Sequence, residues 1–223
     1  MRPLEYEFLE SARAFGIELT PGFMDSFRTF SGELIKWNRK INLTAAKGID
    51  QILLHHILDS LVPVPHLVDA RRIADVGSGA GFPGVPMKIV MRETHMVLIE
   101  SIRKKASFLD HVVTLLGLKG IEVIWNRVEG DQVQRRFETE PLDALISRAA
   151  LPARLILEAG GRILKRDGRV VLMKGALSEA DIVTLEAACR PDNWKIIRDF
   201  RYRLPQTRQD RSLVILQRGF GFT

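Results

Sequence analysis

The sequence contains very little cysteine and no long apolar run. Its single cysteine, Cys189, lies in an apolar helical stretch, which excludes an internal disulfide and a metal cluster built on cysteines. No apolar run approaches the roughly 20 residues that a membrane-spanning helix needs. Acidic residues stand where a signal peptide would have its apolar core. We therefore expect a soluble, cytoplasmic protein without a membrane partner.

Positive charge is unevenly distributed along the chain. The formal net charge is +6, yet residues 1–70 hold seven Lys and Arg against nine Asp and Glu. The tract from residue 190 onward holds eight basic residues and three acidic ones. This pattern is compatible with a polyanionic partner such as a nucleic acid, and equally with a solvated basic surface.

Apolar spacing divides the chain into a helical part and an alternating part. Residues 4–15, 21–37 and 49–61 have helical spacing, and prolines at 63 and 65 end this part. Beyond it, apolar strands alternate with amphipathic helices, which is typical of a parallel sheet covered on both faces. The predicted strands are 72–76, 96–100, 121–125, 142–147 and 169–173.

The C-terminal end departs from this alternation. Residues 194–204 and 212–217 are strand-like, and the loop between them is too short for a crossover helix, so we expect an antiparallel hairpin. Together these elements predict an α/β, Rossmann-like class I methyltransferase fold with a mostly parallel seven-stranded sheet. We expect residues 1–66 to form an N-terminal helical extension and residues 67–223 to form the S-adenosylmethionine-binding methyltransferase domain.

The most informative segment runs from Asp75 to Gly84. A strand-like run leads into four closely spaced glycines, which let the main chain turn sharply and approach a ligand. The spacing Gly79-x-Gly81-x-x-Gly84 also fits the dinucleotide fingerprint, so the glycines alone do not separate NAD from S-adenosylmethionine. Asp75, the additional Gly77 and the terminal hairpin favour S-adenosylmethionine, whose cationic methionine end needs an acidic neighbour.

Other candidate cofactor residues follow the next strands. Glu100 closes the second predicted strand, where its carboxylate can accept both ribose hydroxyls. The loop after residue 125 contains Val128 and Glu129, whose backbone groups can read the adenine edge. A solvated strand-end carboxylate is the alternative for Glu100.

Basic residues end two later strands at the edge where open α/β sheets bind ligands. Arg148 follows the fourth strand, so it is a candidate ligand contact at this edge. The alternative is a structural salt bridge to Asp75 or Glu129. Lys174 ends the next strand and can contact cofactor carboxylate or substrate phosphate, or be solvated.

Two adjacent histidines do not indicate a metal site. His55 and His56 point about 100° apart on a helix, so they do not chelate one ion easily. We expect no metal; packing of the extension against the main domain through His56 and Asp59 is the better interpretation. The segment 37–44 is interpreted as a helix end and loop near the cofactor pocket.

These segments together resemble a specific family, the ribosomal RNA small subunit methyltransferase G family, also called glucose-inhibited division protein B. The resemblance runs from about residue 36 to residue 215, in the family's order. The matching segments are Trp37-Asn38, Asn42-Leu43-Thr44, His56-Ile57-Leu58-Asp59-Ser60-Leu61, Asp75 to Gly84, Arg127-Val128-Glu129, Ser147-Arg148-Ala149, Lys174-Gly175 and Arg211-Ser212-Leu213-Val214-Ile215.

The resemblance implies methylation of a guanosine at N7 in 16S ribosomal RNA of the small subunit, with S-adenosylmethionine as donor. The cofactor contacts that it implies are Gly77, Phe82, Val128, Glu129 and Arg148, to which the residue reasoning adds Asp75, Gly79 and Glu100. At Phe82 the resemblance implies an apolar wall of the cofactor pocket, but it does not imply stacking of an aromatic ring. RNA contacts are expected from Arg148, Lys174, Arg208 and Arg211, and the protein is expected to be a monomer.

The expected chemistry agrees with what the sequence lacks. Methylation of a pyrimidine carbon needs a cysteine nucleophile, and Cys189 stands apart from every strand-edge motif. The Asn/Asp-Pro-Pro-aromatic turn of exocyclic-amine methyltransferases is replaced by Ser147-Arg148-Ala149-Ala150. Guanine N7 already presents a lone pair, so alignment can supply most of the catalysis without a dedicated base, and no catalytic residue is named.

Two alternative functions remain open from the residues. One is a non-catalytic ribosome-assembly or RNA-binding module, against which the intact Asp75, glycine turn, Glu100 and Arg148 argue. The other is an NAD-dependent oxidoreductase, for which the sequence offers no obvious acid/base group for hydride transfer.

Overall fold

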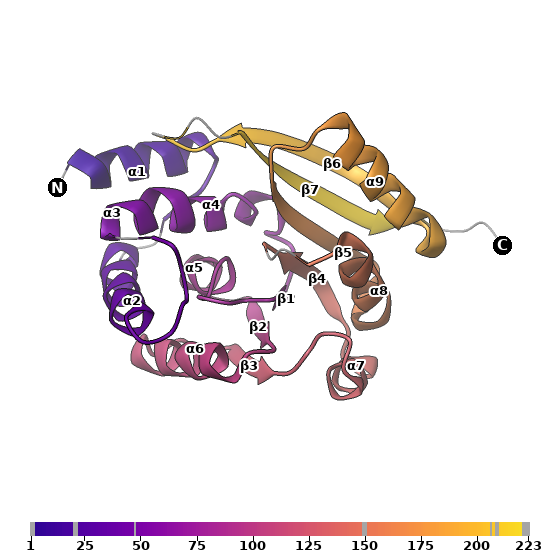
Figure 1. Ribbon diagram of the computed structural model, residues 1–223, viewed down its shortest axis with the longest axis horizontal. Coiled ribbons are helices and arrows are strands. Elements are labelled where there is room, and N and C mark those ends of the chain that lie inside the picture. Colours follow the sequence, from indigo (N-terminus) through magenta and orange to yellow (C-terminus); the bar gives the residue numbers. More distant parts are fainter. Residues whose placement is uncertain are drawn as a thin grey trace.

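Seven strands of the computed structural model form one sheet, in the order β3-β2-β1-β4-β5-β7-β6 (Figure 1). The structure describes residues 3–19, 22–46, 48–148, 151–205, 207 and 210–219. The strands are β1 (Arg72–Val76), β2 (His95–Glu100), β3 (Ile121–Trp125), β4 (Leu142–Ser147), β5 (Leu164–Gly175), β6 (Trp194–Arg203) and β7 (Asp210–Arg218).

The strand pairing follows the sequence pattern. Strands β1 to β5 pair in parallel, whereas β7 runs antiparallel to both β5 and β6. The predicted mostly parallel sheet with a C-terminal antiparallel hairpin is therefore confirmed. Strand β5 is longer than predicted and begins directly after its preceding helix.

Helices cover both faces of the sheet (Figure 1). The α-helices are α1 (Pro3–Ala14), α2 (Phe23–Asn38), α3 (Ile49–Gln51), α4 (Leu58–Leu61), α5 (Gly84–Val90), α6 (Arg103–Leu115), α7 (Asp131–Glu138), α8 (Ala153–Ile163) and α9 (Glu179–Cys189). Shorter turns are the π-helical η1 (Ile52–Ile57) and the 3-10 turns η2 (Val64–His66) and η3 (Arg190–Asp192). The predicted helix at 49–61 is thus interrupted by a π-helical segment.

The two faces of the sheet have separate hydrophobic clusters. One cluster joins residues of α1, α2, α4, α5 and α6 to one face, and the other joins residues of α7, α8 and α9 to the opposite face. Alternate residues of β1 enter different clusters, Ile73 the first and Ala74 the second, because strand side chains alternate between faces.

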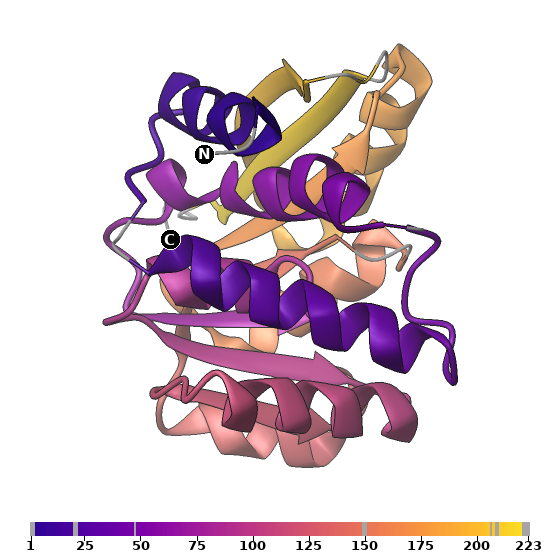
Figure 2. The same cartoon turned by 90° about the vertical axis from the view of Figure 1, so that its left-hand side faces the viewer.

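The N-terminal helices cover the first face (Figure 2). Helix α2 buries Phe23, Phe27, Phe30 and Leu34, whose spacing places them on one side of a helix. These side chains share one cluster with Leu98 and other residues of the sheet. The helical extension therefore packs onto the sheet with a common core, and the boundary at residues 66 and 67 stays a prediction.

Candidate active site

The glycine turn after β1 takes the conformation that its composition predicts. Gly77, Gly79 and Gly81 have φ angles of 73°, 57° and 88°, a region that side chains with a Cβ rarely adopt. The amide of Gly77 donates to the carbonyl of Ile99 at 2.9 Å, which ties the turn to the end of β2. The turn thereby lies at the carboxyl edge of the central parallel strands, the edge that binds ligands in such folds.

Asp75 lies fully buried beneath this turn. Its Oδ2 accepts a hydrogen bond from the Gly84 amide at 2.9 Å, whereas Oδ1 has no hydrogen-bond partner among the described residues. Burial raises the pKa of Asp75 to about 7, and the nearby Glu100 adds to the rise. A buried carboxylate oxygen without a partner is costly unless a donor arrives, so the site fits a cationic group of a ligand.

Glu100 is bound to backbone amides at the end of β2. Its Oε2 accepts from the Gly79 amide at 2.8 Å and its Oε1 from the Ile102 amide at 2.7 Å. The side chain is therefore held beside the glycine turn, and each oxygen keeps a further lone pair. It is not the solvated strand-end carboxylate of the alternative interpretation, because it is only 5% exposed.

A cavity of about 290 Å³ lies next to the turn. It brings together Gly77, Val128 and Glu129, three of the residues predicted to contact the cofactor. Leu151 and Leu155, which were not predicted from the sequence, also line it. The signal that could have indicated them is the mostly apolar sequence of residues 151–157, around the start of α8. Asp75, Gly79, Glu100, Phe82 and Arg148 do not line this cavity.

Phe82 lies on the other side of the turn, among residues of the N-terminal helices. Its ring is stacked on His56, with centroids 5.0 Å apart, and meets Phe30 edge-on at 5.3 Å. The guanidinium of Arg148 lies over the same ring at 5.8 Å. Phe82 therefore connects the glycine turn to the N-terminal segment, which the sequence did not reveal.

His56 is neutral in this environment. Burial, and then the positive charge of Arg148, lower the pKa of His56 to about 4. Because an Arg148 Nη2 group 3.2 Å from Nδ1 can only donate, Nδ1 is the acceptor and Nε2 carries the proton toward Thr44 Oγ1, 3.3 Å away. The neutral ring thus links Arg148 to the loop after α2.

Acidification from pH 6.5 to 4 is expected to destabilise the fold through His56. In this interval the unfolded chain protonates His56 but the folded protein does not, so the free energy of unfolding falls, by at most roughly 3 kcal/mol from this residue. Urea unfolding at a series of pH values measures the fall. His56→Asn, which retains an acceptor but does not titrate, should lose less stability over this interval. An equal loss in both proteins would contradict the assignment.

Arg148 is almost buried and is bound to the N-terminal segment. Its Nε lies 2.9 Å from Asp59 Oδ2, and its side chain is 14% exposed. The ion pair therefore has a different partner from the Asp75 or Glu129 considered from the sequence. Arg211 Nε lies 2.8 Å from the other oxygen of Asp59. Two residues predicted to contact RNA are thus joined through one buried carboxylate.

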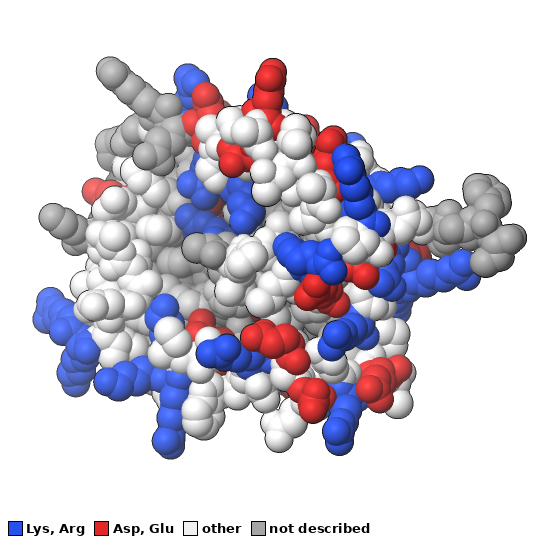
Figure 3. Space-filling view, turned by 45° about the vertical axis from the view of Figure 1, so that its right-hand side comes forward, with Lys and Arg blue, Asp and Glu red and all other residues white. Residues whose placement is uncertain are grey.

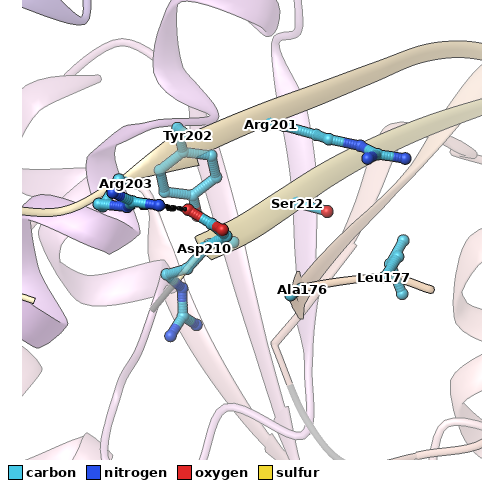
Figure 4. Close-up of a pocket in the computed structure, with 8 residues that line it drawn as sticks. Ala176, Leu177, Arg201, Tyr202, Arg203, Asp210 and Ser212 are labelled. Atoms are coloured by element: carbon cyan, nitrogen blue, oxygen red, sulfur yellow. Dashed lines mark hydrogen bonds and ion pairs between the residues drawn. The ribbon is translucent and has the colours of Figure 1, made fainter. Parts of the chain in front are cut away.

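A second cavity, of about 570 Å³, opens beside the C-terminal hairpin (Figure 4). Three arginines line it, and Arg203 forms an ion pair with Asp210 at 2.6 Å. Arg201 and Arg203 were not predicted individually as site residues, although both belong to the basic tract from residue 190 onward. The lining residues are Ala176, Leu177, Arg201, Tyr202, Arg203, Asp210, Arg211 and Ser212.

The remaining predicted residues lie near this edge or outside the description. Lys174 is half-buried in β5 opposite Ser212, and burial lowers its pKa. Arg208 lies outside the described residues. Cys189 is buried in α9, away from both cavities.

Two classes of feature are not found in the described part of the chain. No group of three or more His, Cys, Asp and Glu side chains within residues 3–219, as far as these are described, is arranged to hold a metal ion. In the same part, none of the helices combines the length and the apolar character that crossing a membrane requires.

Solved structures share this fold. The ribosomal protein L11 methylase of Lactobacillus delbrueckii subsp. bulgaricus aligns with a TM-score of 0.55 at 15% identity, covering 73% of this chain and 78% of that one. TYW2 of M. jannaschii in complex with AdoMet aligns with a TM-score of 0.50 at 16% identity, covering 66% and 69%. The chain therefore has a Rossmann-like methyltransferase fold.

Sequence similarity narrows the class to one family. Residues 24–200 match the family described as rRNA small subunit methyltransferase G, or GidB. The ribosomal RNA small subunit methyltransferase G of Aromatoleum aromaticum is 34% identical over 208 residues, 92% of this chain and 94% of that relative. This chain belongs to the rRNA small subunit methyltransferase G family, as the resemblance of its motifs predicted.

Proposed function

We propose that this protein transfers a methyl group from S-adenosylmethionine to N7 of a guanosine in 16S ribosomal RNA of the small ribosomal subunit. The observation that carries the proposal is Asp75, a buried carboxylate beneath a glycine turn that borders a cavity. One of its oxygens has no hydrogen-bond partner in the part of the chain that the structure describes. Membership of the rRNA small subunit methyltransferase G family supports ribosomal RNA as the substrate.

The methionine end of the cofactor fits the buried charges at the turn. Asp75 Oδ1 would accept a hydrogen bond from the ammonium group, directly or through water, which would satisfy the oxygen of Asp75 that has no partner among the described residues. Arg148 would contact the carboxylate group. Gly77 and Gly79 let the main chain approach, and Phe82 supports the turn from behind.

The nucleoside end fits the cavity of about 290 Å³. Glu100 would accept the ribose hydroxyls with the lone pairs that its two backbone hydrogen bonds leave available. Backbone groups of Val128 and Glu129 would read the edge of the adenine, while Leu151 and Leu155 would cover its face.

The chemistry needs positioning more than proton transfer. When bound, S-adenosylmethionine supplies a methyl group on a positively charged sulfur. Guanine N7 carries a lone pair and no proton, so no residue of the chain has to act as a base. The protein contributes by holding N7, methyl and sulfur in line and by excluding water. The carboxylates of Asp75 and Glu100 would hold the methionine end and the ribose of the donor.

The RNA would bind along the rim of the second cavity. Figure 3 shows Lys and Arg side chains gathered in a hollow in the upper half of one face of the molecule. Arg201 and Arg203 have 63% and 60% exposed side chains, whereas that of Arg211 is 18% exposed. We therefore add Arg201 and Arg203 to the sequence-predicted RNA contacts, which are Arg148, Lys174, Arg208 and Arg211.

Arg201→Gln and Arg203→Gln are expected to weaken binding to small subunits and to flatten its salt dependence. Each lost phosphate contact should reduce the slope of log K against log[salt] by about 0.7 to 0.9. Filter binding between 50 and 200 mM salt, the range over which such contacts change affinity strongly, measures the slope. Arg135→Gln, an exposed arginine of α7, is the control. Unchanged slopes in both rim variants would refute this surface.

The enzymatic proposal is tested by tritiated methyl transfer to small subunits that lack the modification. Nucleoside analysis of the product should detect 7-methylguanosine. Detection of N6-methyladenosine or 5-methylcytidine instead would overturn the proposed substrate atom, and no transfer at all would favour a non-catalytic RNA-binding module.

A further inference from the structure

Asp59 of the N-terminal segment is the centre of a buried charge cluster. It lies in α4, is 0% exposed and pairs with Arg148 and Arg211 through different oxygens. The hydroxyl of Tyr202 donates to Asp59 Oδ1 at 2.6 Å. The three partners come from the end of β4, from β6 and from β7. One carboxylate thus connects the N-terminal segment to three separate places on the sheet.

All three guanidinium nitrogens of Arg148 contact the N-terminal segment. Its Nε pairs with Asp59, while Nη2 contacts the His55 carbonyl and His56 Nδ1, both at 3.2 Å. Nη1 makes one long contact of 3.5 Å with the His56 carbonyl. These contacts hold the planar guanidinium of Arg148 in a fixed orientation.

The charge of the cluster is suited to an anion. Two arginines share the single negative charge of Asp59, so the buried group carries net positive charge. Burial, and then the positive charge of Arg211, lower the pKa of Arg148, although Asp59 raises it. The positive charge of the cluster is thus held at a cost. An anionic ligand group beside Arg148 would offset this cost.

The same carboxylate also lies behind the second cavity. Tyr202 and Arg211, both bound to Asp59, line that cavity at the proposed RNA rim. Asp59 thus supports the cofactor side through Arg148 and the RNA side through Arg211.

We propose that Asp59 is a positioning residue: it orients Arg148 toward the carboxylate of the amino-acid end of the cofactor and holds Arg211 and Tyr202 at the wall of the second cavity. This inference rests on the proposed function. It assigns to the N-terminal segment a direct part in building the cofactor site.

The test compares two ligands in calorimetry. S-adenosylhomocysteine has the amino-acid carboxylate, and 5′-methylthioadenosine lacks it. Asp59→Asn keeps the volume and an acceptor for Tyr202 but removes the charge that orients Arg148. We expect S-adenosylhomocysteine to bind about tenfold more weakly, as for loss of a hydrogen bond to a charged group, and 5′-methylthioadenosine to bind as in the wild type. Equal affinities for S-adenosylhomocysteine in variant and wild type overturn the inference, and so does an equal loss for both ligands.

A second variant covers the case in which Asp59→Asn does not fold. Arg148→Lys retains a positive charge but loses the planar fork that Asp59 and the two carbonyls hold. The preference for S-adenosylhomocysteine over 5′-methylthioadenosine should fall in this variant too, and an unchanged preference counts against positioning. Failure of the wild type to bind S-adenosylhomocysteine would instead refute the proposed function itself.

Discussion

Asp75→Asn is expected to weaken the binding of S-adenosylhomocysteine by roughly 30-fold or more, the lower end of the cost of removing one partner of a buried charge pair. The variant keeps the size of the side chain and an acceptor for the Gly84 amide, so the turn should stay folded. It loses the negative charge that would face the ammonium group. Calorimetry on both proteins measures the difference, and 5′-methylthioadenosine, which has no ammonium group, should bind both about equally.

The pH dependence provides an independent check of the same residue. Because the pKa of Asp75 is raised to about 7, its carboxyl is largely protonated below that pH in the free protein. Binding of the ammonium group favours the ionised carboxylate of Asp75, so binding at a pH below 7 must release the proton of this carboxyl group. The affinity of the wild type should fall as pH is lowered through 7, by up to about tenfold per unit. The Asn variant should show no such fall, and a parallel pH profile would contradict the role of Asp75.

Gly84→Ala is expected to destabilise the protein by about 1 to 3 kcal/mol and to abolish tight cofactor binding. A Cβ at this position would clash with Leu98 Cδ2 and lie 2.7 Å from Asp75 Oδ2. Such contacts are too short to persist, so either the start of α5 or Asp75 must move. Either movement breaks the hydrogen bond from the Gly84 amide that holds the carboxylate in place.

Urea unfolding and calorimetry measure the two effects of Gly84→Ala. Gly32→Ala is the matched control, since Gly32 lies within α2 and a Cβ there would meet nothing within 4 Å. That substitution should leave stability unchanged or raise it by about 0.5 to 1 kcal/mol through helix propensity. If Gly84→Ala had the same stability and cofactor affinity as the wild type, the turn would tolerate a side chain at this position and the prediction would be wrong.

Local patterns were sufficient to predict the architecture. Strand and helix periodicity, the short loop before β7 and the glycine spacing after Asp75 each depend on residues that are close in the chain. They predicted the parallel sheet, its terminal hairpin and a sharp glycine turn, all of which the structure contains; Gly77, Gly79 and Gly81 make this turn with positive φ angles. They also placed Gly77, Val128 and Glu129 at one sheet edge, where they line a common cavity.

The roles of the arginines depended on contacts between distant residues. The sequence placed Arg148 and Arg211 at or beside strand ends on the correct edge of the sheet. It did not indicate their pairing with Asp59, because Arg148 lies 89 positions and Arg211 lies 152 positions after Asp59 in the chain. No spacing rule indicates such a pairing, because it depends on how the N-terminal helices pack on the sheet. The same holds for the stacking of His56 on Phe82.

The sequence by itself thus determined the fold, the family and the residue types of the cofactor turn, since these follow from periodicity, from glycine conformations and from motif order. Only the tertiary structure decided which charged groups are buried together and which remain exposed. It placed Arg148 and Arg211 on one buried carboxylate and left Arg201 and Arg203 on the surface. Burial and pairing are properties of the packed chain, and they decide whether a guanidinium is available to a ligand.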